Sequence, residues 1–562
     1  MGSLTRRDML VGGAAAAATI AVLTAEGCQL SGGAGGPGIP GNLDSYELTA
    51  QYSTHTFAGK TLRTRTYDGQ IPGPTIYAAP GQPFNVTINN QLPPDPPAKV
   101  PASAIVHPVS SMEDMENPAG THSIGVLSTS IDPMNNPHLF NTTNLHVHGV
   151  QIVPHLFDPV GTSNPSAMMI AINPGTSLTY NFVLPPNHPS GLYWYHPHHH
   201  GSTDVQVSGG MAGLIIIGGP IDRVPEIAAA REIPIAVQSL QVNADATQPG
   251  IYDTEYIAYR TPQNGGYNPR SQYMFVLSNG QLVTLIDFTT VNFGVSTDYP
   301  PPQITMQPGE VVRFRILNGT NTLNLPLQLP GFEMYVIGHD GVNLLAPQLI
   351  DQTGSGSAFA TSAGRIEMLV RAPQTVGTYT LKALAVSDPG VHPWPQFDLM
   401  SILVAGAPVS MNIPAALPTP AREYPLIADS EIVGTRNVVF NSKPSTSILP
   451  GFALTVNGVV YDEMTIMFDL AVGTAEQWVI SNDMPEGHPF HLHTNSFEAH
   501  SVTTPSGTTN YTPPIICDTF WIPANGSLTM RVRYKEWKGK DVFHCHKLSH
   551  EDQGMMANTM LV

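Results

Sequence analysis

Apolar and polar residues alternate along many short segments of this 562-residue chain, and glycine and proline separate these segments. One of them, residues 81–89, places Phe84, Val86 and Ile88 on one side and polar residues between them. A period of two is typical of a β-strand with one face in a core. Few long stretches have helical periodicity, and 51 glycines with 53 prolines supply turns. The pattern predicts an all-β protein.

A diverged repeat occurs three times and sets the expected architecture. Each copy begins with an Asx-Gly turn, then has a glycine turn and an alternating strand that ends at an asparagine, and later a second strand introduced by glycine. The turns are Asp68-Gly69, Asn279-Gly280 and Asn457-Gly458; the first strands lie at 81–89, 309–318 and 473–482, the second at 191–196, 377–382 and 539–544. We therefore predict three consecutive antiparallel β-sandwiches, at 42–222, 223–410 and 411–562.

The N-terminal 41 residues have the layout of an export signal followed by a linker. Arg6 and Arg7 precede an alanine-rich apolar run at 11–23, which indicates the twin-arginine route. That run is too short for a stable transmembrane helix, so we expect none in the mature protein. Residues 31–41 are glycine-rich and predict a flexible linker. Cys28 could carry a lipid, but Glu26 fits a lipid-attachment motif poorly. We expect a periplasmic, cell-surface or extracellular protein.

Composition narrows the classes of partner. Acidic residues outnumber basic ones 42 to 24, for a formal net charge of −18. Such a surface disfavours nucleic acid and anionic membranes and attracts cations, although solubility alone also explains it. The chain has only three cysteines, Cys28, Cys517 and Cys545. If Cys545 binds a metal, at most Cys28 and Cys517 could pair, so the fold must depend on its apolar cores.

Ten of the 21 histidines fall into four clusters, each with a His-x-His pair on an expected strand. Side chains two apart on a strand point to the same face, so each pair directs two imidazoles at one place. Four pairs supply eight imidazoles, which ordinary core packing does not require. The clusters are His146 with His148, His196 with His198, His488 with His491 and His493, and His544 with His546 and His550.

Cys545 separates two of these histidines, and strand alternation sends its thiolate to one face and His544 and His546 to the other. His488, His550 and Met555 are further candidates on the thiolate side. Two imidazoles, a thiolate and a weak thioether are typical of a blue copper electron-transfer site. The eight paired imidazoles divide as 3+3+2 among three more copper ions, whereas zinc would require closed tetrahedral sites. The sequence thus predicts four copper ions per chain.

The middle copy of the repeat lacks these ligands. Residues 325–328 (LPLQ) correspond to 490–493 (FHLH) of the third copy, and Lys382 stands at the position of His196 and His544. The strands remain while the ligands are absent. We therefore expect the copper cluster between the first and third domains, with the middle domain acting as a spacer.

These motifs closely resemble those of the three-domain multicopper oxidases, of the laccase and spore-coat-laccase type, over essentially the whole mature chain. They are NLHVHG at 144–149, YWYHPH at 193–198, HPFHLH at 488–493 and HCHKLSH at 544–550, followed by Met555. The resemblance implies three cupredoxin-like Greek-key domains. It assigns His488, Cys545, His550 and axial Met555 to the blue copper, His146 and His491 to a mononuclear copper, and His148, His196, His198, His493, His544 and His546 to a coupled pair.

Acids near such a cluster have a clear chemical use, because reduction of dioxygen to water consumes protons. Glu551 matches an acid that some bacterial relatives use there. Asp158, ten residues after His148, is a weaker match because the local spacing differs. Either could instead be an ordinary solvated carboxylate. His199 and His200 extend the second motif, and we interpret them as outer-shell or surface groups.

The resemblance implies an oxidase that couples one-electron oxidation of phenols or aromatic amines to four-electron reduction of dioxygen. A methionine axial ligand usually places the blue-site potential low in the range of the family, which suits easily oxidised substrates. Oxidation of Cu(I), Mn(II) or Fe(II) is the alternative; the acidic surface favours it, but no methionine-rich insertion precedes the last motifs. A copper-binding scaffold without turnover is a third interpretation.

Overall fold

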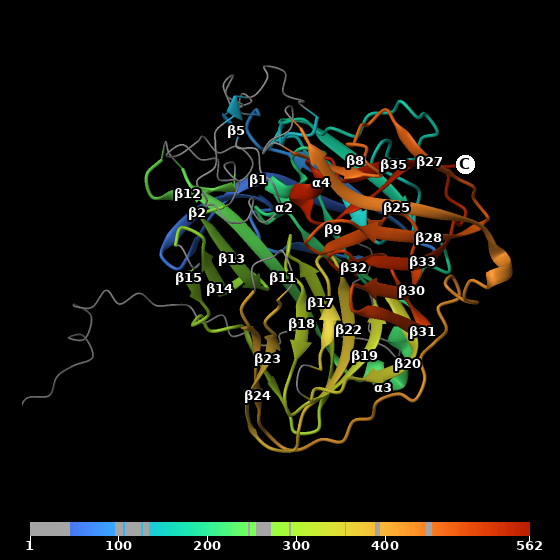
Figure 1. Cartoon of the computed structure of the whole chain (residues 1–562). Helices are drawn as coiled ribbons and strands as arrows, with labels where there is room; N and C mark the ends of the chain where they lie inside the picture. Colours follow the sequence, from blue (N-terminus) through green and yellow to red (C-terminus); the bar gives the residue numbers. More distant parts are fainter. Residues whose placement is uncertain are drawn as a thin grey trace, which may run out of the picture.

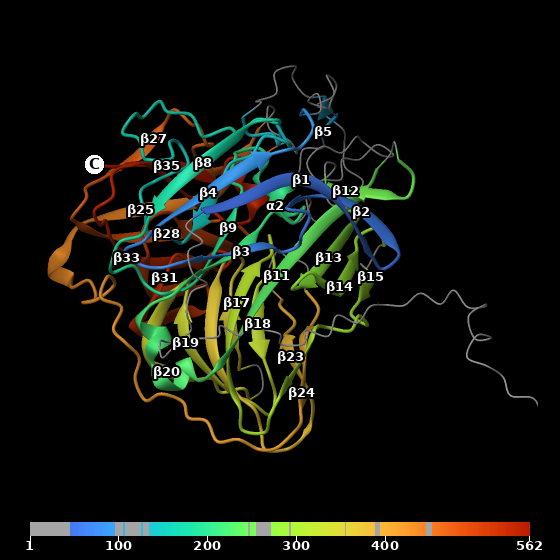
Figure 2. The same ribbon diagram turned by 180° about the vertical axis from the view of Figure 1, so that it is seen from behind.

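The computed structural model describes residues 45–95, 105–106, 125–126, 134–245, 248–254, 271–290, 294–353, 356–387, 394–445 and 452–562. The expected export signal and linker, with Cys28, lie outside these residues. The described strands form three β-sandwiches, which confirms the predicted fold class (Figures 1 and 2). In the described part of the chain, no helix combines the length and the apolar character needed to cross a membrane.

The first sandwich contains the first two histidine motifs. Its elements are β1 (Ser45–Phe57), β2 (Lys60–Tyr67), β3 (Gly73–Ala78), β4 (Pro83–Asn90), β7 (His146–His148), β8 (Ser177–Val183), β9 (Gly191–His196), α2 (Thr203–Val207) and β10 (Gly213–Ile217). Between β4 and β7 along the chain, β5 (Ile105–Val106) and β6 (Gly125–Val126) form a separate two-stranded sheet. One sheet has the order β2-β1-β4-β8 and the other β3-β10-β9-β7. The alternation in β4 buries Phe84, Val86 and Ile88 between them.

The middle sandwich follows two short helical segments, η1 (Pro220–Arg223) and α3 (Pro225–Ala228). Its strands are β11 (Arg231–Ala244), β12 (Ile251–Asp253), β13 (Tyr273–Ser278), β14 (Gln281–Asp287), β15 (Gly294–Ser296), β16 (Gln303–Met306), β17 (Val311–Gly319), β18 (Leu325–Gln328), β19 (Glu333–His339), β20 (Val342–Leu349), β21 (Ala358–Ala360), β22 (Arg365–Arg371), β23 (Gly377–Ala383) and β24 (Phe397–Val404). Because β12 pairs with both β11 and β2, one sheet runs from the first domain into the second.

The third sandwich contains the last two motifs. Its elements are η3 (Asp429–Glu431), β25 (Ile432–Pro444), β26 (Phe452–Val456), β27 (Ile466–Leu470), β28 (Ala475–Asn482), β29 (His488–Leu492), β30 (Phe497–Thr504), β31 (Gly507–Cys517), β32 (Thr519–Ile522), β33 (Ser527–Arg533), β34 (Gly539–Cys545), α4 (Leu548–Glu551) and β35 (Met556–Leu561). The sheets have the orders β26-β25-β28-β33-β30-β31 and β27-β35-β34-β29-β32.

The three Asx-Gly turns have the same local structure in all three domains. The Asx residue is left-handed, with φ of 53° at Asp68, 47° at Asn279 and 54° at Asn457. Its Oδ1 accepts a hydrogen bond from a strand amide at 2.8–2.9 Å, and its own amide donates back to the carbonyl oxygen of that strand residue. Asn and Asp suit this position because they tolerate left-handed backbone and carry an acceptor.

Each following strand has, as its last or next-to-last residue, an asparagine that joins two loops to the sandwich. The side-chain amides of Asn90, Asn318 and Asn482 each donate to two backbone carbonyl oxygens. In the first domain this residue is Asn90 and not Asn89, at which the predicted segment ended, because β4 continues to Asn90. The repeat is therefore one residue longer there than its sequence pattern indicated.

All four strands that carry motif histidines, β7, β9, β29 and β34, are buried at every residue. A strand buried on both faces needs a second layer on each side. The first and third domains cover each other at the histidines, and Leu192 and Trp194 of β9 also pack against the middle domain. The segment 405–431, orange in Figure 1, runs along the outside of the molecule from the middle domain to the third. On its way Arg422 bonds to Gln151 of the first domain and Glu536 of the third.

Candidate metal centre

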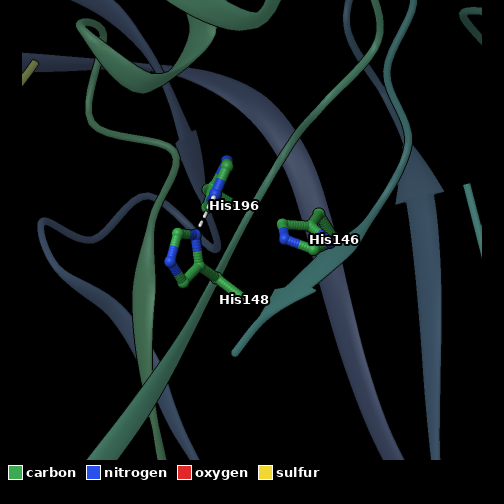
Figure 3. Close-up of side chains that lie close together, drawn as sticks. All are labelled: His146, His148 and His196. Atoms are coloured by element: carbon green, nitrogen blue, oxygen red, sulfur yellow. Dashed lines mark hydrogen bonds between the residues drawn. The ribbon is translucent and has the colours of Figure 1, made fainter. Parts of the chain in front are cut away.

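Eight of the ten motif histidines meet where the first and third domains face each other. His146 pairs with His196 across β7 and β9, and His491 with His544 across β29 and β34. Between domains, the rings of His146 and His493 stack with centroids 4.0 Å apart, and those of His148 and His491 at 3.8 Å. His146, His148 and His196 appear in Figure 3. We predicted that both members of each pair lie on a strand. In three pairs the second member, His198, His493 or His546, instead lies just beyond the end of its strand.

Protein oxygens orient most of these imidazoles. The Nδ1–H of His196, His491 and His544 donates to a backbone carbonyl oxygen at 2.8–2.9 Å. A carboxylate lies beside Nδ1 of His198 and of His493, at 3.3 and 3.6 Å. The Nε2 atoms then point inward; those of His198 and His493 lie 3.1 and 3.2 Å from Nε2 of His544. Histidines that bind metals are held in this way by their second ring nitrogen.

Burial keeps the imidazoles neutral, and a neutral imidazole has a free lone pair. It lowers the pKa of His196 to about 3 and of His544 to about 4, and lowers the pKa of the other six far below the usual value. Among the described residues, both ring nitrogens of His146 and His546 and the Nε2 of His491 have no hydrogen-bond partner. Buried polar atoms seldom lack partners, so this donor set fits transition-metal ions.

A second, separate group surrounds Cys545 on the other side of the same sheet. The ligand atoms of His488, Cys545 and His550 lie within 4.8 Å of one another. The thiol faces the core of the third domain, where Met555 is fully buried in the same cluster of side chains. The amide of Lys547 donates to Sγ at 3.4 Å. Burial raises the pKa of Cys545, so a thiolate there requires a cation beside it.

A buried ion pair adjoins this second group, and the motifs gave no signal for it. One carboxylate oxygen of Glu486 lies 3.4 Å from Nε2 of His550 and 3.7 Å from Nε2 of His488. Its other oxygen accepts a hydrogen bond from Lys547 Nζ at 2.5 Å. Glu486 is 1% exposed and Lys547 4%. A charged pair therefore lies against both imidazoles that flank the thiol.

Of the two acids singled out in the sequence, the structure places only Glu551 at the cluster. Its carboxylate oxygens lie 3.3 Å from His198 Nδ1 and 3.4 Å from His544 Nδ1, and Thr203 donates to one of them at 3.2 Å. Burial, with Asp552 nearby, raises the pKa of Glu551 well above its usual value. Asp158 instead stabilises a turn by accepting the amide of Val160, because the chain bends into a loop after β7.

His199 and His200 are buried, so of the two predicted alternatives, outer-shell or surface groups, the surface position is wrong. His200 Nε2 lies 3.2 Å from the side-chain oxygen of Asn135, and its ring packs on Tyr461. The carbonyl oxygen of His199 accepts hydrogen bonds from Ser202 and Thr203 at the start of α2. Both residues thus support the turn that leads from the second motif into this helix.

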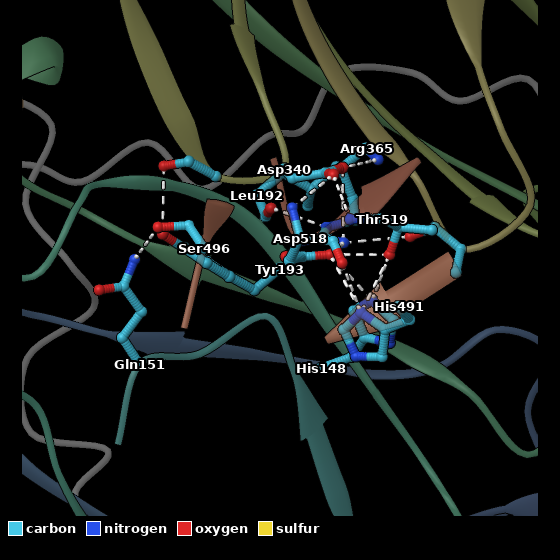
Figure 4. A network of polar contacts seen from close by, with 12 residues as sticks. His148, Gln151, Leu192, Tyr193, Asp340, Arg365, His491, Ser496, Asp518 and Thr519 are labelled. Atoms are coloured by element: carbon cyan, nitrogen blue, oxygen red, sulfur yellow. Dashed lines mark hydrogen bonds and ion pairs between the residues drawn. The ribbon is translucent and has the colours of Figure 1, made fainter. Parts of the chain in front are cut away.

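Asp518, between β31 and β32, is a further acid that the sequence did not reveal. Its Oδ1 lies 3.2 Å from His148 Nε2 and 3.5 Å from His491 Nδ1. The guanidinium of Arg365, in the middle domain, donates a hydrogen bond to each carboxylate oxygen of Asp518 (Figure 4). The hydroxyl of Thr519 also contacts both imidazoles, at 3.2 and 3.1 Å. No motif joins these residues, since they come from three domains.

The corresponding place in the middle domain has no such ligands. Gln328 lies opposite Lys382 across β18 and β23, as His491 lies opposite His544 in the third domain. This pairing aligns Gln328 with His491. The comparison of repeats had aligned it with His493, so that alignment was wrong by two residues. The molecule thus has three sandwiches, a buried imidazole cluster between two of them, and a buried cysteine on the far side of the sheet that carries His544. This arrangement is typical of a copper oxidoreductase.

Comparisons with known proteins agree with that class. Models of the multicopper oxidase family match residues 129–221, 240–392 and 434–561. Laccases of Haloferax volcanii and Bacillus subtilis are each 24% identical over 91% of this chain, covering 80% and 93% of their own lengths. Solved structures with the same fold include a multicopper oxidase from Campylobacter jejuni described as a metallo-oxidase (TM-score 0.64, 22% identity, 93% and 92% coverage) and McoA from Aquifex aeolicus (0.63, 20%, 92% and 96%).

The chain belongs to the multicopper oxidase family. It is a laccase-like, copper-dependent oxidoreductase that uses dioxygen.

Proposed function

We propose that the protein carries four copper ions and oxidises phenols or aromatic amines, reducing dioxygen to water. One blue copper is held in the third domain and three form a cluster between the first and third domains. The observation that carries this proposal is the position of Cys545, whose thiol lies in one buried group while its neighbour His544 lies in the other.

The residues divide between two tasks. His488, Cys545 and His550 would hold the blue copper, with Met555 buried in the same core cluster, and the eight paired histidines would hold the other three copper ions. When bound, the copper ions accept electrons singly and pass four of them, with four protons, to one dioxygen molecule, which yields two water molecules. Cys545 is bonded through its backbone to His544 and His546, so this strand is the shortest covalent connection between the two groups.

Glu551 is the proposed proton donor to the cluster. Its carboxyl group touches two cluster histidines and is fully buried, so it can hold a proton directly beside the histidine cluster. Asp158 has no comparable contact among the described residues, and we assign it no role in the reaction.

Absorption spectroscopy with copper counting tests the proposal. We expect the intense visible band of a copper thiolate, four copper ions per chain, and oxygen consumption with a phenolic dye. A chain that binds copper fully but consumes no oxygen with any reductant would be a scaffold and would overturn it.

Oxidation of metal ions is the second candidate. The net charge of −18 attracts cations, and one structurally similar oxidase is described as a metallo-oxidase. Comparing kcat/KM for a phenol with that for Cu(I), Mn(II) and Fe(II) separates the two. Metal ions turned over more efficiently than every phenol and aromatic amine would favour this candidate.

We also propose export by the twin-arginine route, supported by Arg6 and Arg7 ahead of the apolar run. Replacing both arginines by lysine should leave the protein in the cytoplasm, which cell fractionation would detect. Lipid labelling tests the remaining alternative, attachment at Cys28.

A further inference from the structure

The middle domain, which supplies no histidine to the cluster, is linked to it through two charged residues that bind Asp518 and Thr519. Arg365, at the start of β22, is 1% exposed. It donates from Nη1 to one carboxylate oxygen of Asp518 at 2.8 Å and from Nη2 to the other. A planar guanidinium that engages both oxygens fixes the direction of a carboxylate, which a lysine cannot do. The orientation of Asp518 is therefore set from outside its own domain.

Asp340, in the turn between β19 and β20, fixes the backbone of the same segment. Its Oδ2 accepts hydrogen bonds from the amides of Asp518 and Thr519, both at 3.1 Å. Its Oδ1 accepts the amide of Arg365 at 2.8 Å. One carboxylate thus ties the middle domain to both residues that touch His148 and His491.

The first domain is shaped to receive this group. Gly149, which ends the NLHVHG motif, has a left-handed φ of 79°. A Cβ atom at Gly149 would collide with the guanidinium of Arg365 and with the carboxylate of Asp518. The motif therefore needs glycine directly after His148, because the Arg365–Asp518 pair packs there.

We propose that Arg365 and Asp340 are positioning residues of the copper cluster, acting through Asp518 and Thr519 on His148 and His491. The middle domain is then more than a spacer, because it sets the direction of one ligand in each part of the cluster. The proposal rests on the proposed trinuclear cluster. Residues that orient metal ligands typically change metal affinity or activity ten- to a hundredfold when replaced.

The principal test is Arg365→Lys, with Arg313→Lys as the matched control. Arg313 is also fully buried in the middle domain, and its Nε and Nη2 both donate hydrogen bonds to Glu367. We expect Arg365→Lys to keep the blue absorption and the anaerobic rate of blue-copper reduction. The electron paramagnetic resonance signal of the mononuclear cluster copper should change, and reoxidation by dioxygen should slow about ten- to a hundredfold. Arg313→Lys should change neither.

Chemical rescue provides a second readout. Arg365 and Asp340 line a cavity of about 440 Å³ between the middle and third domains, so Arg365→Ala opens toward a space that small cations can enter. Added methylguanidinium should restore the signal and the reoxidation rate of Arg365→Ala but have no effect on Arg313→Ala. If Arg365→Ala does not fold, Asp340→Asn tests the same point through the backbone of Asp518.

The outcomes separate the inference from the proposed function. Wild-type protein without a three-copper cluster would refute the function itself. A wild-type cluster with an unchanged signal and reoxidation rate in Arg365→Lys, or the same changes in Arg313→Lys, would overturn only the positioning role.

Discussion

His544 and Cys545 are neighbours in β34, yet they point to opposite faces of one sheet. His544 lies opposite His491, facing the first domain, while Cys545 lies opposite Phe490, facing the core of the third. Strand alternation alone produces this arrangement. One peptide unit therefore separates the two buried groups, so a change at Cys545 should affect both the blue site and the supply of electrons to the cluster.

Replacing Cys545 by Ser should remove the blue absorption and oxidase activity together while leaving most copper bound. A serine hydroxyl does not provide the soft thiolate on which the colour and the electron path depend. Cys517→Ser is the control, since Cys517 is also buried and forms no disulfide with another described residue, and it should keep both properties. Oxygen consumption that survives in Cys545→Ser would contradict the proposed connection between the two groups.

Replacing Glu551 by Gln should lower kcat at least about tenfold with reductant and dioxygen saturating, because the donor carboxyl beside His198 and His544 is lost. Copper content and the blue band should not change. Asp158→Asn is the comparison, since Asn can still accept the turn amide of Val160. Equal rates for the two variants would argue against Glu551 as the donor.

Periodicity and short spacing made the local features of the molecule predictable from its sequence. Alternating strands, the three Asx-Gly turns and the His-x-His pairs are local patterns, so the sandwiches and the grouping of the histidines could be predicted. The Arg365–Asp518 contact joins residues 153 positions apart, and the contact of Asp518 with His148 spans 370. Such pairs form only when folded domains pack together, so no local sequence motif predicts them. Asp158 was predicted from its spacing to His148 alone. In the structure it lies in a turn of the loop after β7, where it accepts the amide of Val160.

The free energy of unfolding should fall as the solution is acidified from pH 6.5 to about 4. Burial lowers the pKa of His188 to about 3 and of His155 and His339 to about 4, against about 6.5 in the unfolded chain. Between these values the unfolded state binds more protons, so stability present at neutral pH is lost. His188→Gln should reduce the dependence by about 1.4 kcal/mol per pH unit, seen in denaturation at several pH values. An unchanged dependence would show that His188 does not contribute.

The Glu486–Lys547 pair should tune the reduction potential of the blue copper in opposite directions. Glu486 places negative charge against His488 and His550, which stabilises the more highly charged Cu(II) form, and Lys547 offsets it from the other carboxylate oxygen. Glu486→Gln should therefore raise the potential and Lys547→Met should lower it. The shifts should be on the order of 100 mV, because two unit charges about 6 Å apart interact by about 3 kcal/mol at an effective dielectric constant of about 20, and about 59 mV is tenfold for one electron. Redox titration of the blue band measures both variants. Shifts of the same sign would mean that repacking around the copper, and not the charge of the pair, controls its potential.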